Sequence, residues 1–86
     1  MQRENLIRSF PLDSINKPGG TEIFYSLIFD ENGNMAVEEF HDFDQPHKNS
    51  RAMFIAPENF DKHEVNGVPL RKLVVNKLKE ILPILN

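Results

Sequence analysis

Two apolar segments flank the turn sequence Asp30-Glu31-Asn32-Gly33-Asn34, and this pattern constrains the chain more than any other. The segment before it, 21–30, is rich in β-branched and aromatic residues, and a second apolar segment follows at 35–43. The turn sequence fits a three-residue hairpin loop in which the glycine adopts the left-handed region and forms a bulge. The pattern therefore predicts a β-hairpin over residues 21–44.

The same turn predicts the register of the hairpin. It places Leu27 opposite Val37 on one face of the sheet and Phe24 opposite Phe40 on the other. Such cross-strand pairs stabilise a sheet, and a slip of one residue would move every side chain to the opposite face. Both faces of segment 21–30 are apolar at most positions, which is typical of a central strand that is covered on two sides.

The last part of the chain predicts an amphipathic helix over residues 69–82. Apolar side chains recur there at the spacing of one helix face, at Leu70, Leu73, Val74, Leu78, Ile81 and Leu82. With Val75 the apolar arc spans roughly 200°, which is wider than one packing surface needs. Two arrangements fit: the helix lies in a groove between the sheet and the N-terminal segment, which we favour, or part of it forms a homodimer contact. Pro83 is expected to end the helix near Leu82.

The segments between hairpin and helix predict smaller elements. Residues 51–56 predict a third short strand, and Pro57 with the acid after it predicts the start of a short helix. Asn66-Gly67 is expected to end that helix or to turn the chain.

The N-terminal segment predicts a short helix. Its apolar residues recur in a loosely periodic pattern that Pro11 interrupts, so a helical turn followed by irregular chain is expected. The fold class predicted for residues 1–86 is a single small α+β domain. It has a small antiparallel sheet, made of hairpin 21–44 and a third strand near 51–56, packed against helix 69–82, with a short N-terminal helical segment.

Several strands followed by one long helix is an order that resembles the small ββββα single-strand DNA-binding domains of transcriptional coactivators. Those domains use a basic aromatic strand, which has no counterpart in this sequence. The resemblance therefore implies no functional residue here.

The chain of 86 residues contains no cysteine, which excludes disulfides, thiolate zinc sites and a cysteine nucleophile. Small secreted domains usually need disulfides, so this composition favours the cytoplasm. The N-terminal ten residues hold no apolar run of the kind found in signal peptides, and no apolar segment is long enough to span a membrane. We therefore expect a cytoplasmic protein with no membrane contact.

The sequence contains no pattern typical of catalysis or metal binding. His41, His47 and His63 lie near aspartates but show no ligand spacing, so they are interpreted as solvated surface residues. The turn at 30–34 resembles a calcium loop only superficially, because its glycine stands at the fourth position rather than the sixth. No nucleophile-elbow, triad or phosphate-loop pattern is present either. The chain is expected to be no enzyme and to use no cofactor and no metal.

Charge is distributed unevenly along the sequence. Residues 1–44 hold nine acidic and three basic side chains, whereas residues 45–86 hold four acidic and seven basic ones. Such asymmetry can indicate a binding surface. The leading hypothesis is a small non-catalytic binding or regulatory module that contacts an unknown protein partner through acidic residues of the hairpin, namely Asp30, Glu31, Glu38, Glu39, Asp42 and Asp44.

The alternative is a nucleic-acid-binding module that uses the basic second half of the chain. Its candidate residues are Lys48, Arg51, Lys62, Arg71, Lys72 and Lys79. An acidic overall balance, with a net charge of -3, makes nucleic acid the less favoured partner without excluding it.

Overall fold

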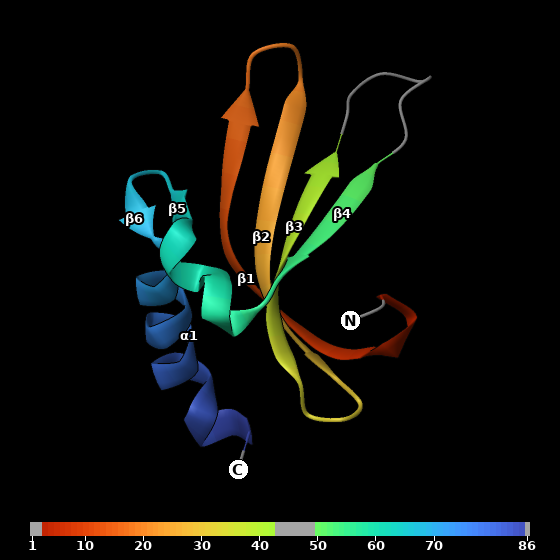
Figure 1. Cartoon of the computed structure of the whole chain (residues 1–86), viewed down its shortest axis with the longest axis vertical. Coiled ribbons are helices and arrows are strands. Elements are labelled where there is room, and N and C mark those ends of the chain that lie inside the picture. Colours follow the sequence, from red (N-terminus) through yellow and green to blue (C-terminus); the bar gives the residue numbers. More distant parts are fainter. Residues whose placement is uncertain (1–2, 43–49, 86) are drawn as a thin grey trace.

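The computed structural model describes residues 3–42 and 50–85. One antiparallel sheet contains four strands in chain order: β1 (Leu6–Lys17), β2 (Thr21–Asp30), β3 (Met35–Asp42) and β4 (Arg51–Ile55). A second sheet pairs two short strands, β5 (Glu64–Val65) and β6 (Val68–Pro69), and it precedes the helix α1 (Leu70–Leu85). Short 3₁₀ segments, η1 (Arg3–Asn5) and η2 (Pro57–Lys62), precede β1 and follow β4 (Figure 1).

The β2–β3 hairpin has the register that its turn predicts. Leu27 pairs with Val37 and Phe24 with Phe40, within a continuous ladder from Phe29–Met35 to Glu22–Asp42. In the turn, the Asp30 N–H donates to the Asn34 carbonyl at 3.0 Å and Gly33 has a φ of 81°. The local turn chemistry is therefore sufficient to specify the pairing of these two strands.

The Asp30 side chain closes this turn. Its Oδ1 atom accepts hydrogen bonds from the N–H groups of Asn32 and Asn34, each at 2.9 Å, and its Oδ2 atom accepts one from the Asn34 side-chain amide at 3.0 Å. The hydrogen bond from the Asn34 side chain is the largest cause of a lowered Asp30 pKa, and burial opposes it. Asp30 is only 6% exposed, so this acid serves the fold.

The predicted fold class is wrong at the N-terminus and in the number of strands. Residues 6–17 form a strand of 12 residues, and the described part of the chain has no N-terminal helix beyond the single 3₁₀ turn of η1. Pro11 is tolerated because β1 is an edge strand and its pairing with β2 shifts register next to this proline. The main sheet therefore has four strands instead of three.

At residues 64–69 the predicted turn at Asn66-Gly67 is confirmed, but it joins two short strands that the sequence does not predict. Asn66 and Gly67 adopt φ angles of 53° and 80°, as a two-residue hairpin turn requires, and they join β5 to β6. The Asn66 side-chain amide also donates to Asp13 Oδ2 and to the Ser14 carbonyl, both at 3.0 Å. These bonds connect the small hairpin to β1.

The C-terminal helix begins at Leu70 rather than at Pro69, which belongs to β6, and it is longer than predicted, because it continues through Pro83 to Leu85. Pro83 stands in the last turn and is exposed, so its missing N–H removes a single helical hydrogen bond, the one to the Lys79 carbonyl, near the end of the helix. Only part of the wide apolar arc is buried: Leu70 is fully buried, whereas Val75 and Leu82 are 42% and 50% exposed. The favoured groove is not formed as expected, since the N-terminal segment is itself part of the sheet.

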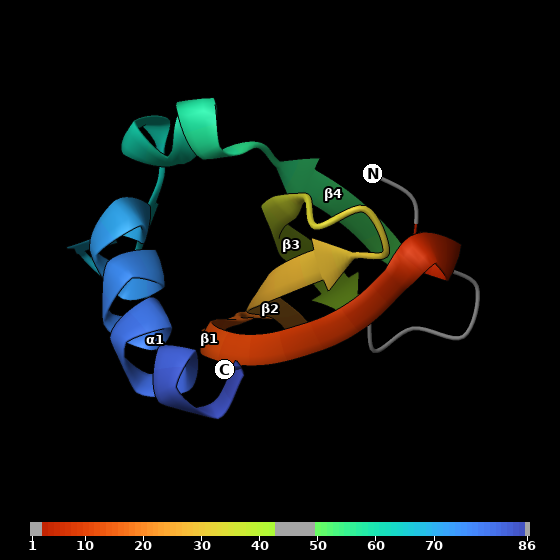
Figure 2. The same cartoon turned by 90° about the horizontal axis from the view of Figure 1, so that it is seen from below.

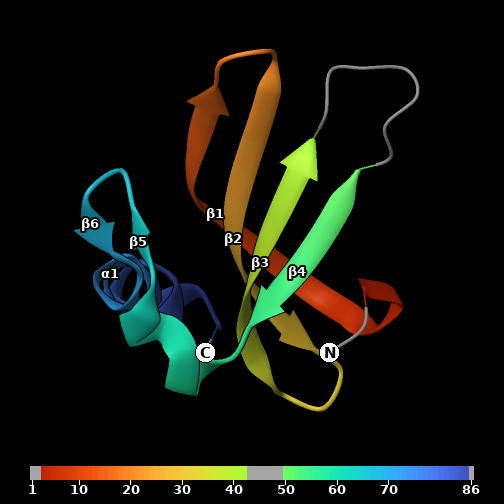
Figure 3. The same ribbon diagram turned by 45° about the horizontal axis from the view of Figure 1, so that its top comes forward.

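The main core lies between α1 and one face of the sheet, which we call the inner face. Strand residues alternate onto this face and meet side chains of η2, β5 and α1; the buried set is Ile23, Tyr25, Leu27, Val37, Ile55, Phe60, Val65, Leu70, Val74 and Ile81. The sheet is strongly curved, and the N-terminal half of β1 swings away from α1 towards the β4 side (Figures 2 and 3). Ile28 and Ala36, on the opposite or outer face, are also buried.

Leu70→Ala tests the docking of α1 on this core. Leu70 is 0% exposed, so truncation should lower the free energy of unfolding by about 2–5 kcal/mol, through lost burial and a cavity. Val75→Ala on the solvent side of the same helix should change it by less than about 0.5 kcal/mol. Urea denaturation of both variants measures the difference, and equal effects would contradict the described packing.

Asp30→Asn tests the turn. The folded-state pKa of Asp30 is lowered, so its carboxylate stabilises the fold above the ordinary pKa of 3.8, and this contribution is lost as the pH falls from that value through the lower folded-state pKa. The variant should melt at a lower temperature at neutral pH, and its difference from the native chain should shrink as the pH falls from about 5 towards 2. Asp42→Asn, at an exposed acid, is the control for a general loss of charge. A difference that stays constant with pH would count against the hydrogen-bonded carboxylate.

Candidate functional site

A polar cluster lies at one end of the inner face, where Tyr25, Glu39 and His41 approach one another. Tyr25 on β2 pairs directly with Glu39 on β3, and His41 follows on the same face two residues later. His41 Nε2 and Glu39 Oε1 are 2.5 Å apart, and the two side chains are 21% and 17% exposed. Strand alternation thus assembles the cluster from residues close together in the hairpin.

Tyr25 in this cluster has a raised pKa. Burial, the negative charge of Glu39 and a hydrogen bond to Glu39 raise its pKa to about 12, in that order of importance. The phenol therefore stays protonated and donates to a carboxylate that also contacts His41. Glu39 is engaged on both sides, which suits a structural polar contact better than a reacting group.

Strand β4 continues the two cross-strand rows of side chains to which Glu39 and His41 belong. Met53 lies opposite Glu39, and Arg51 lies opposite His41. Met53 is 53% exposed although it shares the inner face with the buried Ile55, and Arg51 is exposed as well. β4 is also the last strand of the sheet. An exposed apolar side chain and an exposed cation thus stand at an open edge.

Of the six predicted acidic residues, the five that the structure describes do not lie on one surface. Asp30 is bound within the turn, and Glu31 beside it is exposed. Glu38 is buried, at 7% exposed, on the outer face, whereas Glu39 is on the inner face with His41. Asp42 is exposed at the end of β3, and Asp44 lies outside the described residues.

The five predicted basic residues that the structure describes are also dispersed. Arg71 donates from Nε to Asp61 Oδ1 at 2.6 Å and lies over the Phe60 ring, with 5.9 Å to its centroid. Lys72 and Lys79 are exposed seven residues apart on α1, Lys62 is exposed at the end of η2 and Arg51 is on β4. Lys48 lies outside the described residues. Nucleic-acid binding through these side chains stays a prediction.

The histidines differ from one another in their surroundings. His41 is bound to Glu39 and mostly buried, so the interpretation as a solvated side chain is wrong for this residue. His63 is half-buried after η2, and His47 lies outside the described residues. Over the parts of the chain that the structure describes, no three His, Cys, Asp or Glu residues are placed to hold a metal ion.

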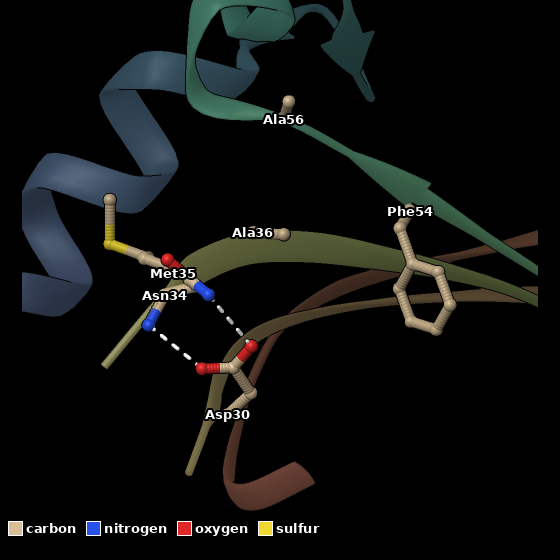
Figure 4. Close-up of a pocket in the computed structure, with 6 residues that line it drawn as sticks. All are labelled: Asp30, Asn34, Met35, Ala36, Phe54 and Ala56. Atoms are coloured by element: carbon tan, nitrogen blue, oxygen red, sulfur yellow. Dashed lines mark hydrogen bonds between the residues drawn. The ribbon is translucent and has the colours of Figure 1, made fainter. Parts of the chain in front are cut away.

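Two shallow cavities lie on the sheet. One, of about 280 Å³, is lined by Asp30, Asn34, Met35, Ala36, Phe54 and Ala56. Figure 4 shows the Asp30 carboxylate at one end of it, bound to Asn34, with Ala36, Phe54 and Ala56 as apolar wall. The second, of about 250 Å³, lies where the pairing of β1 shifts next to Pro11. Polar and apolar surface line the first cavity about equally, but the turn already uses both Asp30 oxygens, so this carboxylate is committed to the fold.

Comparison with known protein families, with curated proteins and with solved structures finds no match. Within the described residues, no helix combines the length and the apolar character that crossing a membrane requires. The site must therefore be interpreted from its own geometry.

Sequence reasoning missed both Met53 and the Tyr25–Glu39–His41 cluster as site residues. A signal for the cluster was present, because the predicted hairpin register already places Tyr25 opposite Glu39 with His41 on the same face. Met53 had no such signal, since its exposure depends on β4 being an edge strand.

Titration of Tyr25, the single tyrosine of the chain, tests the cluster. Its tyrosinate absorbance should appear with a pKa of about 12, and Glu39→Gln should move that pKa towards 10 by removing the charge. Because the folded-state pKa is raised, the stability that depends on it is present below the ordinary value and is lost as the pH rises from 10 towards 12. Circular dichroism in the same titration shows whether the chain is still folded, and a folded chain that titrates near 10 would refute the described contact.

Proposed function

We propose that this chain is a non-catalytic, cytoplasmic protein-binding module whose binding edge is β4, which accepts an extended segment of a partner as a fifth strand. The observation that carries the proposal is the position of β4 at the end of the sheet, with Met53 half exposed at its centre. Along its unpaired edge, the last strand of a sheet presents backbone donors and acceptors that a further strand can pair with.

The two edges of the sheet differ in how they are protected. β1 contains Pro11, has two register shifts, and contacts α1 and β5. These features are the ones by which folded proteins block pairing at a strand edge. β4 pairs with β3 without a register shift and contains no proline, and Arg51 is its single charged residue. Within the described residues, β4 is the edge that is open to another strand.

The side chains of β4 indicate what such a strand would contain. On the inner face, Met53 offers an apolar contact and Arg51 a cation, next to the half-buried pair of Glu39 and His41. A partner strand with an apolar residue beside Met53 would bury both side chains, and backbone hydrogen bonds would supply the rest of the affinity.

A photo-reactive amino acid at position 53 tests this function. In native lysate it should form more adducts than the same amino acid at Asn76, an exposed position on α1. Arg51→Ala, introduced into the protein that is labelled at position 53, should still give more adducts than labelling at position 76. The reason is that the backbone hydrogen-bonding groups of β4 are unchanged in this variant. Equal labelling from positions 53 and 76 would refute β4 as the binding edge, and the masses of the adducts identify what is bound.

A further inference from the structure

We infer that the strand accepted by β4 is β4 of a second copy of this chain, paired antiparallel about a two-fold axis at Met53. This inference rests on the proposed function, because it names the partner of the same edge. A two-fold interface is self-complementary, so each residue of β4 must suit the residue that the axis places opposite it.

The sequence of β4 satisfies that condition. With the axis at Met53, all five residues of β4 pair: Met53 with itself, Ala52 with Phe54 of the second copy, and Arg51 with Ile55 of the second copy. No like charges face each other, because Arg51 is the one charged residue of the strand. Moving the axis to Ala52 or to Phe54 leaves some residues of β4 without a partner on β4 of the second copy. It also places either two alanines or two phenylalanines opposite each other.

The outer face offers a steric fit. Ala52 lies between Phe40, its neighbour on β3, and the open edge. Its methyl group is small, so the Phe54 ring of the second copy would lie over it and reach Phe40. Phe40 and Phe54 are both only half-buried in one chain, and this contact would cover more of their surface.

The inner face would gain a matching apolar contact. The row Tyr25–Glu39–Met53 would continue across the axis into Met53, Glu39 and Tyr25 of the second copy. The two methionines, each 53% exposed in the single chain, would pack on one another at the centre. Five residues make a short interface, so the dimer should dissociate on dilution.

The absence of cysteine allows a direct test of this geometry. Met53→Cys places two thiols opposite each other across the axis, at a separation that a disulfide can bridge. Under mild oxidation most of this variant should become a covalent dimer. Val75→Cys, at an exposed apolar position on α1, should stay largely monomeric.

Light scattering over a range of concentrations completes the experiment. The native chain should approach twice the mass of one 10.0 kDa chain as concentration rises. Met53→Lys should lose this association while staying folded by circular dichroism, because lysine at the edge is solvated and faces Glu39 on β3. Val75→Lys should dimerise like the native chain.

The outcomes are distinguishable. A native chain that stays monomeric at all concentrations overturns the inference, as does a dimer that Met53→Cys fails to cross-link. Photo-adducts of position 53 with a different protein, formed by a monomeric chain, would overturn self-pairing and leave the proposed function standing. Equal labelling from positions 53 and 76 would refute the proposed function as well as the inference that rests on it.

Discussion

The turn between β2 and β3 is the constraint on which the rest of the structure depends. Asp30 accepts three hydrogen bonds within it, and these bonds fix where the two strands start to pair. Because side chains alternate along a strand, that starting point decides which face every hairpin residue occupies. It places Leu27 and Val37 under α1, and it brings Tyr25 and Glu39 together. A shift of one residue would expose the core and separate the polar cluster.

The two edges of the sheet differ in accessibility because different elements flank the β2–β3 hairpin on each side. On the β2 side, β1 is bent at its register shifts, and the β5–β6 hairpin is attached to it through Asn66. On the β3 side, β4 is short and regular, and the chain leaves it at Pro57 to form η2. The helix and the small sheet therefore lie on the β1 side of the fold, which leaves β4 as the edge with an exposed methionine.

The predictable parts of the fold are those determined by neighbouring residues. The hairpin register follows from five turn residues, and α1 follows from the spacing of Leu70, Val74 and Ile81, all of which are buried. β1 was not predictable in this way, because its register shifts change which residues face the core and remove the alternation that identifies a strand. Pro11 then indicates an interrupted helix, although an edge strand tolerates it. The Asn66-Gly67 turn was a local signal for a hairpin, but strands of two residues are too short to show a pattern.

The site was harder to predict than the fold, because the charge of a residue does not show whether it reaches the surface. Counted in sequence, the first half of the chain is strongly acidic, and an acidic binding surface is the natural expectation. The structure buries Asp30 and Glu38 on different parts of the sheet and engages Glu39 with Tyr25 and His41. Burying a carboxylate is costly unless hydrogen bonds compensate, so these acids are committed to partners within the fold. The hairpin consequently offers fewer exposed carboxylates for direct contact with a partner than the sequence suggests. Backbone pairing and apolar contact at β4 do not depend on net charge, and for that reason the open edge is the stronger candidate.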